Sequence, residues 1–416
     1  FGGYSDIWQL MREEPQLQGG FIARWNPVAV WLDGEENTLP SLVDDNLQTV
    51  PYITEIKNLY RNFDVKLLSI SQDAGEFSVA NRCDNQKLSD WTLEYIICSN
   101  LKNSIIEGEV RMDLSPGEVK NFKLKIPKLT LYAGEELFIR FVVKYRDKTD
   151  LVPKGAEMEV FEFLIPMEDV AKQPLPSYGR TPLVVSVSGN ENDSRGFLSV
   201  SNDHAQILFD LDKGTLASYR FDGVDMIDKP LKLTVFRDPT PNDYVDKNGY
   251  VSWKDNASLV REVVDANYHS IDEYTVAVDF MSRYSNSSGA TMMDVKQTIL
   301  VLHSGDVLME NEIVVSDYLR QMPRLGFQTI VGNSLDTVSW YGLNIESYPD
   351  RRNGAITTVN SLQLENASYN YSPNQSSGNH ADVRWVSFTN DKVGFFVDMV
   401  DDCFNFSVSP AEERIA

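Results

Sequence analysis

The sequence has few of the features that mark disulfide-stabilised, membrane-spanning or nucleic-acid-binding proteins. It contains only 3 cysteines, Cys83, Cys98 and Cys403, without C-x-x-C spacing, which favours buried thiols over a disulfide framework. No apolar run approaches the roughly 20 residues that a membrane helix needs. The formal net charge of -23 repels phosphate backbones and anionic lipid. We therefore expect no nucleic-acid and no membrane partner.

Histidine is equally scarce, with 4 residues in the whole chain. They are far apart and show neither H-x-x-x-H nor H-E-x-x-H spacing, the patterns that place two metal ligands on one helix face. We interpret them as surface or core residues: His204, His269, His303 and His380. The sequence therefore predicts no metal site and no cofactor site in this chain.

The remaining composition is that of a soluble globular protein, with 42% hydrophobic residues, 18 Tyr and 20 Phe. At about 100 to 200 residues per domain, a chain of 416 residues should form roughly two to four domains. A neutral ligand such as a sugar is compatible with the negative charge. Composition leaves a cytoplasmic and a periplasmic location equally open.

Residues 1–58 show helical spacing interrupted by a short strand. Apolar residues at helical intervals predict a helix over 6–13, and Gly19-Gly20 then leads into an apolar strand at 21–22. Pro51 is suited to the first turn of a second helix, which the apolar spacing predicts over 51–62. A helix that leads into a strand is the arrangement of a (β/α) barrel.

The period changes to two after this segment. Seven strands are predicted in residues 59–166, which is typical of an immunoglobulin-like sandwich: 65–71, 77–81, 91–98, 105–112, 122–126, 137–143 and 158–165. Residues 167–182 contain Pro174 and Pro176 and are predicted to be a linker. Residues 183–416 alternate strands with hairpin turns such as Asn353-Gly354, which predicts one large β-sandwich.

Four segments carry a family resemblance. They are the opening helix and strand, residues 54–63, Phe236-Arg-Asp-Pro-Thr-Pro-Asn-Asp243, and Trp340-Tyr-Gly-Leu-Asn-Ile-Glu-Ser-Tyr-Pro-Asp-Arg351. Together they resemble the C-terminal half of the large bacterial β-galactosidases of glycoside hydrolase family two. The resemblance implies a mainly β chain. Its parts would be the end of a (β/α)8 catalytic barrel, then the family's immunoglobulin-like fourth domain and its fifth domain, a sandwich similar to galactose mutarotase.

The same resemblance bears on function. Enzymes of that family hydrolyse terminal β-galactosides with two carboxylates about 5 to 5.5 Å apart. It places both carboxylates, and the family's magnesium and sodium ligands, upstream of Phe1. Where the family has Trp-Asp-Trp, the chain reads Ala23-Arg-Trp-Asn-Pro, and only Trp25 is kept. We therefore expect an accessory region with no catalytic residue and no activity of its own, whose partners are the upstream barrel and a galactoside or other neutral sugar.

Four residues of the large sandwich have the chemistry to contact a sugar: Trp340, Tyr348, Asp350 and Arg351. Aromatic rings stack on the apolar faces of pyranoses, and charged groups bind hydroxyls. The same residues could be structural, with Asp350 and Arg351 as an ion pair that holds the turn. Two other functions also stay open: a stand-alone carbohydrate-binding module, and a structural unit that mediates homo-oligomers.

Overall fold

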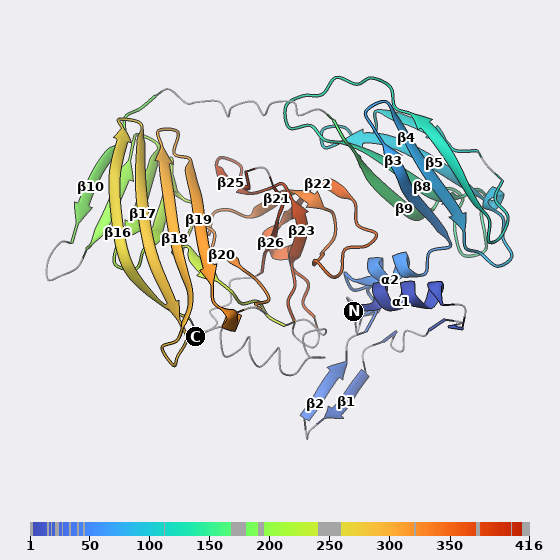
Figure 1. Cartoon of the computed structure of the whole chain (residues 1–416), viewed down its shortest axis with the longest axis horizontal. Coiled ribbons are helices and arrows are strands. Elements are labelled where there is room, and N and C mark those ends of the chain that lie inside the picture. The colour runs from blue at the N-terminus through green and yellow to red at the C-terminus, as the bar shows by residue number, and fades with distance from the viewer. Residues whose placement is uncertain are drawn as a thin grey trace.

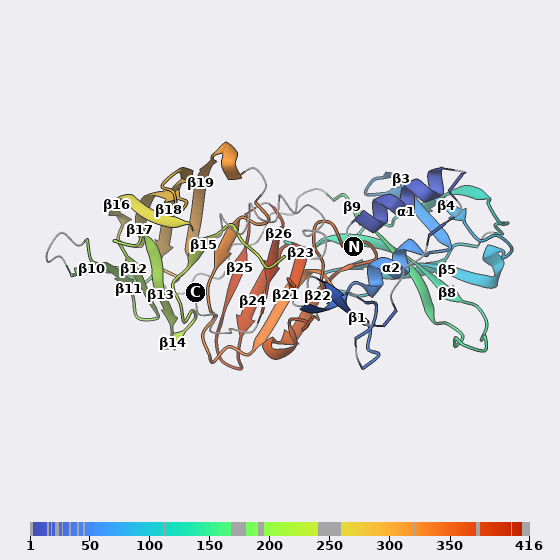
Figure 2. The same cartoon turned by 90° about the horizontal axis from the view of Figure 1, so that it is seen from below.

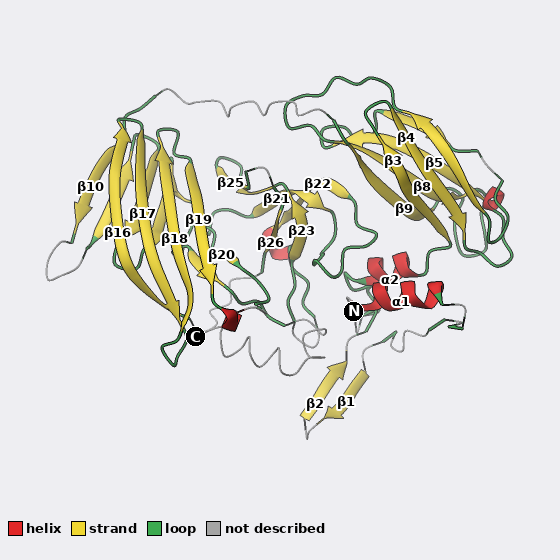
Figure 3. Cartoon of the chain, in the orientation of Figure 1, coloured by secondary structure: helices red, strands yellow, loops and turns green. Residues whose placement is uncertain are grey.

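The structure is a computed structural model in which strands predominate (Figure 1, Figure 3). It describes residues 3–14, 16–17, 19–20, 25–26, 28–32, 35–39, 41–44, 46–111, 113–167, 180–189, 195–239, 259–319, 322–371, 375–400 and 402–409. None of the helices in these ranges is long and apolar enough to cross a membrane.

The N-terminal segment contains two helices and a hairpin. Helix α1 (Gly3–Glu13) covers the predicted helix at 6–13, and α2 (Ile53–Leu59) is shorter than the predicted 51–62. Strands β1 (Val28–Leu32) and β2 (Glu35–Leu39) form an antiparallel hairpin that the sequence did not predict. The strand expected at 21–22 lies outside the described residues. The assignment of residues 1–58 to a barrel stays a prediction.

Residues 63–165 form two packed sheets. Each of the seven predicted strands is confirmed, with shifted ends: β3 (Phe63–Ile70), β4 (Ala74–Asn81), β5 (Trp91–Ser99), β6 (Ile106–Glu109), β7 (Val119–Lys125), β8 (Leu137–Tyr145) and β9 (Glu157–Ile165). Their orders are β3-β4-β7 and β6-β5-β8-β9. The core between them contains Phe77 and Phe141, both fully buried, with ring centroids 4.7 Å apart. This packing explains the alternating pattern of the strands.

The next sandwich consists of two larger antiparallel sheets. One has the order β10 (Val184–Ser188), β11 (Phe197–Ser201), β12 (Ala205–Asp210), β13 (Thr215–Phe221) and β14 (Val224–Asp225). The other has the order β16 (Val260–Asp272), β17 (Thr275–Ser285), β18 (Thr291–Leu302) and β19 (Val307–Val315). Phe209 and Phe280 meet in the core between them. A short pair, β15 (Lys232–Thr234) and β20 (Gly326–Gln328), completes this part. Most of the predicted linker, residues 168–179, lies outside the described ranges.

The last strands have a core of their own. One sheet has the order β22 (Thr357–Gln363), β21 (Thr337–Leu343), β24 (Trp385–Thr389) and β25 (Gly394–Asp398), while β23 (Asn379–Val383) pairs with β26 (Phe404–Ser407). Val338 and Trp340 are buried between these layers. Figures 1 and 2 place this unit between the larger sandwich and the immunoglobulin-like domain. The region predicted as one sandwich therefore contains two main cores.

The cysteines are all free thiols. Cys98 is buried, and Cys83 is partly buried. Cys403 is exposed, so the expectation of a buried thiol was wrong there. Cys403 lies just before β26, where the chain is at the surface, and its small apolar side chain costs little to expose.

Candidate functional site

The Tyr348–Arg351 turn lies where the central strands meet the N-terminal segment. Tyr348 N–H donates to Arg351 O at 3.1 Å, and Arg351 N–H donates back to Tyr348 O at 2.9 Å. The Arg351 guanidinium lies 4.4 Å from the centroid of the Tyr348 ring, a cation–π contact. Both side chains are buried, with exposed fractions of 4% for Tyr348 and 5% for Arg351. The turn therefore folds its two end residues inward onto each other.

Asp350 lies at the exposed tip of this turn. No ion pair joins it to Arg351 among the contacts of the described residues. The ion pair was one of two interpretations of these residues, and the salt bridges between described residues do not include it. The reason is geometric, because the tight bridge sends Asp350 outward while the Arg351 side chain turns back over Tyr348.

Trp340 is a core residue of β21, only 2% exposed. Its indole Nε1–H donates to Leu343 O at 3.0 Å, and its ring packs 4.2 Å from His380 and 5.7 Å from Phe406. Burial lowers the pKa of His380 to about 4, so the imidazole beside Trp340 is neutral at pH 7. Stacking on a sugar needs an accessible ring face, which Trp340 does not offer in this position.

A small pocket separates the turn from helix α2. Pro51, Tyr52 and Glu55 line one side of it. The opposite side comes from the central strands and their loops: Glu346, Tyr348, Arg351 and Tyr371. The pocket has room for about one water molecule. The pocket lies between α2 and the Tyr348–Arg351 turn, segments that are about 300 positions apart in the sequence. The sequence of the turn alone therefore could not reveal the pocket.

Glu346 is the acid of this pocket, and it is only partly exposed. Its carboxylate accepts the Tyr371 hydroxyl at 2.7 Å and the Gly378 N–H at 2.9 Å. Burial raises the pKa of Glu346, although these two hydrogen bonds and the charge of Arg351 act in the other direction. Burial and the nearby Glu346 charge also raise the pKa of Tyr371, so its phenol stays protonated and donates.

Arg351 is the buried, positively charged side chain of the pocket. Its Nε and Nη2 atoms are buried and have no hydrogen-bond partner within the described part of the chain. Buried polar groups almost always have a partner, so two such atoms on one guanidinium distinguish Arg351 from an ordinary packing residue. Sequence reasoning selected Arg351 for its charge, but it could not detect this missing partner.

A buried carboxylate fixes the turn to α2. Glu55 accepts hydrogen bonds from Asn353 N–H and Asn353 Nδ2, both at 2.8 Å. Gly354 follows with φ +82°, and a Cβ there would lie 3.2 Å from Thr54 and 3.3 Å from Asn58. Glycine is required because the backbone has a left-handed conformation and lies close to the helix. The predicted Asn353-Gly354 turn thus also contacts helix α2.

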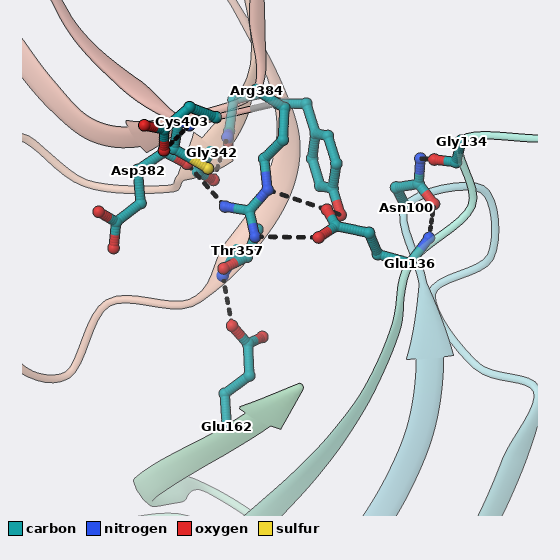
Figure 4. Close-up of polar contacts among 12 residues, drawn as sticks. Asn100, Gly134, Glu136, Glu162, Gly342, Thr357, Asp382, Arg384 and Cys403 are labelled. Atoms are coloured by element: carbon teal, nitrogen blue, oxygen red, sulfur yellow. Dashed lines mark hydrogen bonds and ion pairs between the residues drawn. The ribbon is translucent and has the colours of Figure 1, made fainter. Parts of the chain in front are cut away.

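A second junction connects the central sheet with the immunoglobulin-like domain (Figure 4). Arg384 donates from Nε to Glu136 Oε2 at 2.9 Å and from Nη2 to Glu136 Oε1 at 3.2 Å. The Tyr341 hydroxyl donates to Glu136 at 2.5 Å. Burial alone would lower the pKa of Arg384, but the hydrogen bond and charge of Glu136 outweigh it and raise that pKa. We call Glu136, Tyr341 and Arg384 the interdomain clamp.

A second set of contacts supports the clamp. Arg140 Nε donates to Glu162 Oε2 at 2.7 Å, and Arg140 Nη2 donates to Thr357 O at 2.7 Å. Thr357 N–H donates to Glu162 Oε1 at 2.8 Å. Apolar contact between Phe138 and Tyr341 fills the space between these polar groups. None of these residues was a predicted site residue, because their partners lie in a different domain.

The described residues contain no group of three or more His, Cys, Asp or Glu side chains that could hold a metal ion. The candidate site is a junction of buried polar contacts.

Comparison with known proteins assigns the family. The model described as "Beta galactosidase small chain" matches residues 201–415, just over half of the chain. The chain belongs to this family. The match to the β-galactosidase small-chain model includes Glu346 and Arg351. It does not reach Glu55 or Glu136, so both junctions join matched and unmatched parts.

Individual relatives extend over almost the whole chain. The β-galactosidase of Priestia megaterium (strain DSM 319 / IMG 1521) is 23% identical over 94% of this chain and 38% of that protein. The β-galactosidase of Pseudoalteromonas haloplanktis is 23% identical over 94% and 40%. That of Streptococcus thermophilus is 24% identical over 98% and 40%. The chain thus spans about two fifths of the length of these curated relatives.

Proposed function

We propose that this chain is the C-terminal accessory region of a β-galactosidase-like glycoside hydrolase that cleaves terminal β-galactosides. The main support is the alignment with one β-galactosidase, which covers 94% of this chain but only 38% of that protein. We propose that the proton donor and the nucleophile lie outside residues 1–416. The catalytic carboxylates, and the magnesium and sodium ligands, would then belong to the upstream barrel.

The two junctions support a structural role within such an enzyme. The interdomain clamp and the Glu55–Asn353 contact hold the central sheet against both the immunoglobulin-like domain and α2. A catalytic pair must be held within a fraction of an ångström, and fixed neighbouring domains help to achieve this. We propose that the accessory region buttresses the barrel and shapes its mouth.

Helix α1 offers a surface for the barrel. Ile7 and Leu10 are 55% and 52% exposed, and Leu17 and Trp25 nearby are 46% and 61% exposed. Exposed apolar groups gathered in one short segment are typical of a surface that a partner covers. The proposed partner is the upstream part of the same barrel, which needs eight strands to close.

A carbohydrate-binding module is the second candidate. The observation that favours it is the buried Arg351, whose two donors without a partner in the described part of the chain could bind a sugar hydroxyl. The coding sequence upstream of Phe1 distinguishes the two candidates. A barrel with two glutamates in that sequence supports the hydrolase; an independent start codon or a secretion signal there supports the module or a structural unit.

A further inference from the structure

Arg351 presents an unused hydrogen-bonding edge. The Nε and Nη2 atoms of an arginine point the same way and form a two-pronged donor. Arg384 shows this edge in use, because the same two atoms bind both oxygens of Glu136. In Arg351 both atoms lack a partner within the described residues, and the side chain is only 5% exposed. Bulk solvent therefore cannot satisfy these donors.

The charges around this edge restrict what can occupy it. Glu346 lines the same pocket, yet no ion pair between Glu346 and Arg351 is formed among the described residues. An anion on the Arg351 edge would be repelled by Glu346, and a cation beside Glu346 would be repelled by Arg351. A neutral group that both accepts and donates satisfies both side chains.

Glu346 can receive such a group. Its carboxylate already accepts two hydrogen bonds, from Tyr371 and Gly378. A carboxylate has about four lone-pair positions, so acceptor capacity remains. The pocket has room for about one water molecule, which limits the occupant to a single oxygen with its hydrogens.

We propose that the pocket between α2 and the Tyr348–Arg351 turn binds one neutral hydroxyl oxygen, which accepts from Arg351 and donates to Glu346. Two sources supply this chemistry: an ordered water, or one hydroxyl of a bound sugar. The sugar source rests on the proposed galactoside-related function, and the water source does not.

Crystals of the whole chain grown without polyols test the occupant. One crystal contains sodium bromide and another contains rubidium chloride, and anomalous scattering locates either ion. We expect an oxygen, without anomalous signal, within hydrogen-bond distance of Arg351 Nε and Nη2. A bromide peak on Arg351, a rubidium peak beside Glu346, or an empty pocket would overturn the proposal.

Galactose added to the same crystals separates the two sources. Replacement of the oxygen by a galactose hydroxyl assigns the sugar source, and an unchanged oxygen assigns water. Arg351→Lys removes the two-pronged edge and should lose the oxygen. The control variant is Arg352→Lys. Arg352 is exposed and forms an ion pair with Asp382 at 2.7 Å, so the pocket of this variant should keep the oxygen.

If Arg351→Lys fails to fold, Glu346→Gln keeps the test open. Glutamine keeps one carbonyl oxygen for the Gly378 N–H, and its NH2 group can donate to the Tyr371 hydroxyl. It removes the negative charge, so the oxygen should stay in the rubidium chloride crystal and bromide should replace it in the sodium bromide crystal. Bromide in that variant alone would support charge exclusion by Glu346, whereas bromide in the unmodified chain contradicts it. Failure of the pocket leaves the accessory-region proposal standing, because that depends on the upstream sequence and on activity.

Discussion

Replacement of Arg384 by methionine should weaken the contact between the central sheet and the immunoglobulin-like domain. The variant keeps most of the apolar stem of the side chain but leaves Glu136 with only the Tyr341 hydroxyl as a described partner. Loss of one member of a fully buried pair costs about 3 to 5 kcal/mol, and of an exposed pair about 0.2 to 1 kcal/mol. The side chains of Arg384 and Glu136 are 23% and 30% exposed. We therefore expect an intermediate loss of about 2 kcal/mol.

Thermal and urea unfolding measure this loss. A change of about 2 kcal/mol should lower the melting temperature by roughly 5 °C for units of this size. The control is Arg283→Met, which breaks a pair with Asp294 whose side chains are 47% and 49% exposed. That variant should lose less than about 1 kcal/mol.

A double-mutant cycle isolates the pair itself. Glu136→Gln, Arg384→Met and the double variant should give a coupling free energy of about 1 to 2 kcal/mol. Coupling near zero, or an Arg384→Met loss no larger than that of Arg283→Met, would refute the assignment of the clamp as a stabilising contact.

Three further predictions concern other parts of the chain. Burial raises the pKa of Glu159 to about 7, so the free energy of unfolding should fall by up to about 3 kcal/mol as pH rises from about 4.5 to 7. In urea titrations, the Glu159→Gln variant should show a weaker dependence of this free energy on pH. Gly354→Ala should lower the free energy of unfolding by about 1 kcal/mol or more, and by more than Gly117→Ala does. Both glycines have positive φ, but of the two only Gly354 would place a Cβ within 4 Å of neighbouring atoms. Equal melting temperatures of the two variants would contradict this close approach. Trp340→Ala should cost about 3 to 5 kcal/mol by calorimetry, and an unchanged unfolding curve would contradict its place in the core.

Local patterns predicted the strands of the immunoglobulin-like domain well. Alternation in segments such as Ala74–Asn81 reflects one face packed in a core, and this face is decided by neighbouring residues in the sequence. The hairpin β1–β2 was missed because the apolar run Val28–Leu32 is followed by the polar run Glu35–Leu39, which lacks strand-like alternation.

The site was predictable only in its residue types. Tyr348 and Arg351 were selected for aromaticity and charge, and neither property indicates which residues they contact. The interdomain clamp joins distant segments, since Glu136 and Arg384 are 248 positions apart. Periodicity carries no information about such contacts, and one sequence alone cannot supply it.

The most direct test of the accessory-region account is the activity of this chain by itself. Purified residues 1–416 are incubated with a chromogenic β-galactoside, and the release of the chromophore is compared with buffer. The account predicts no turnover above buffer, because both carboxylates of a retaining mechanism are proposed to lie outside the chain. Turnover that stays with the protein through several chromatographic steps would contradict it.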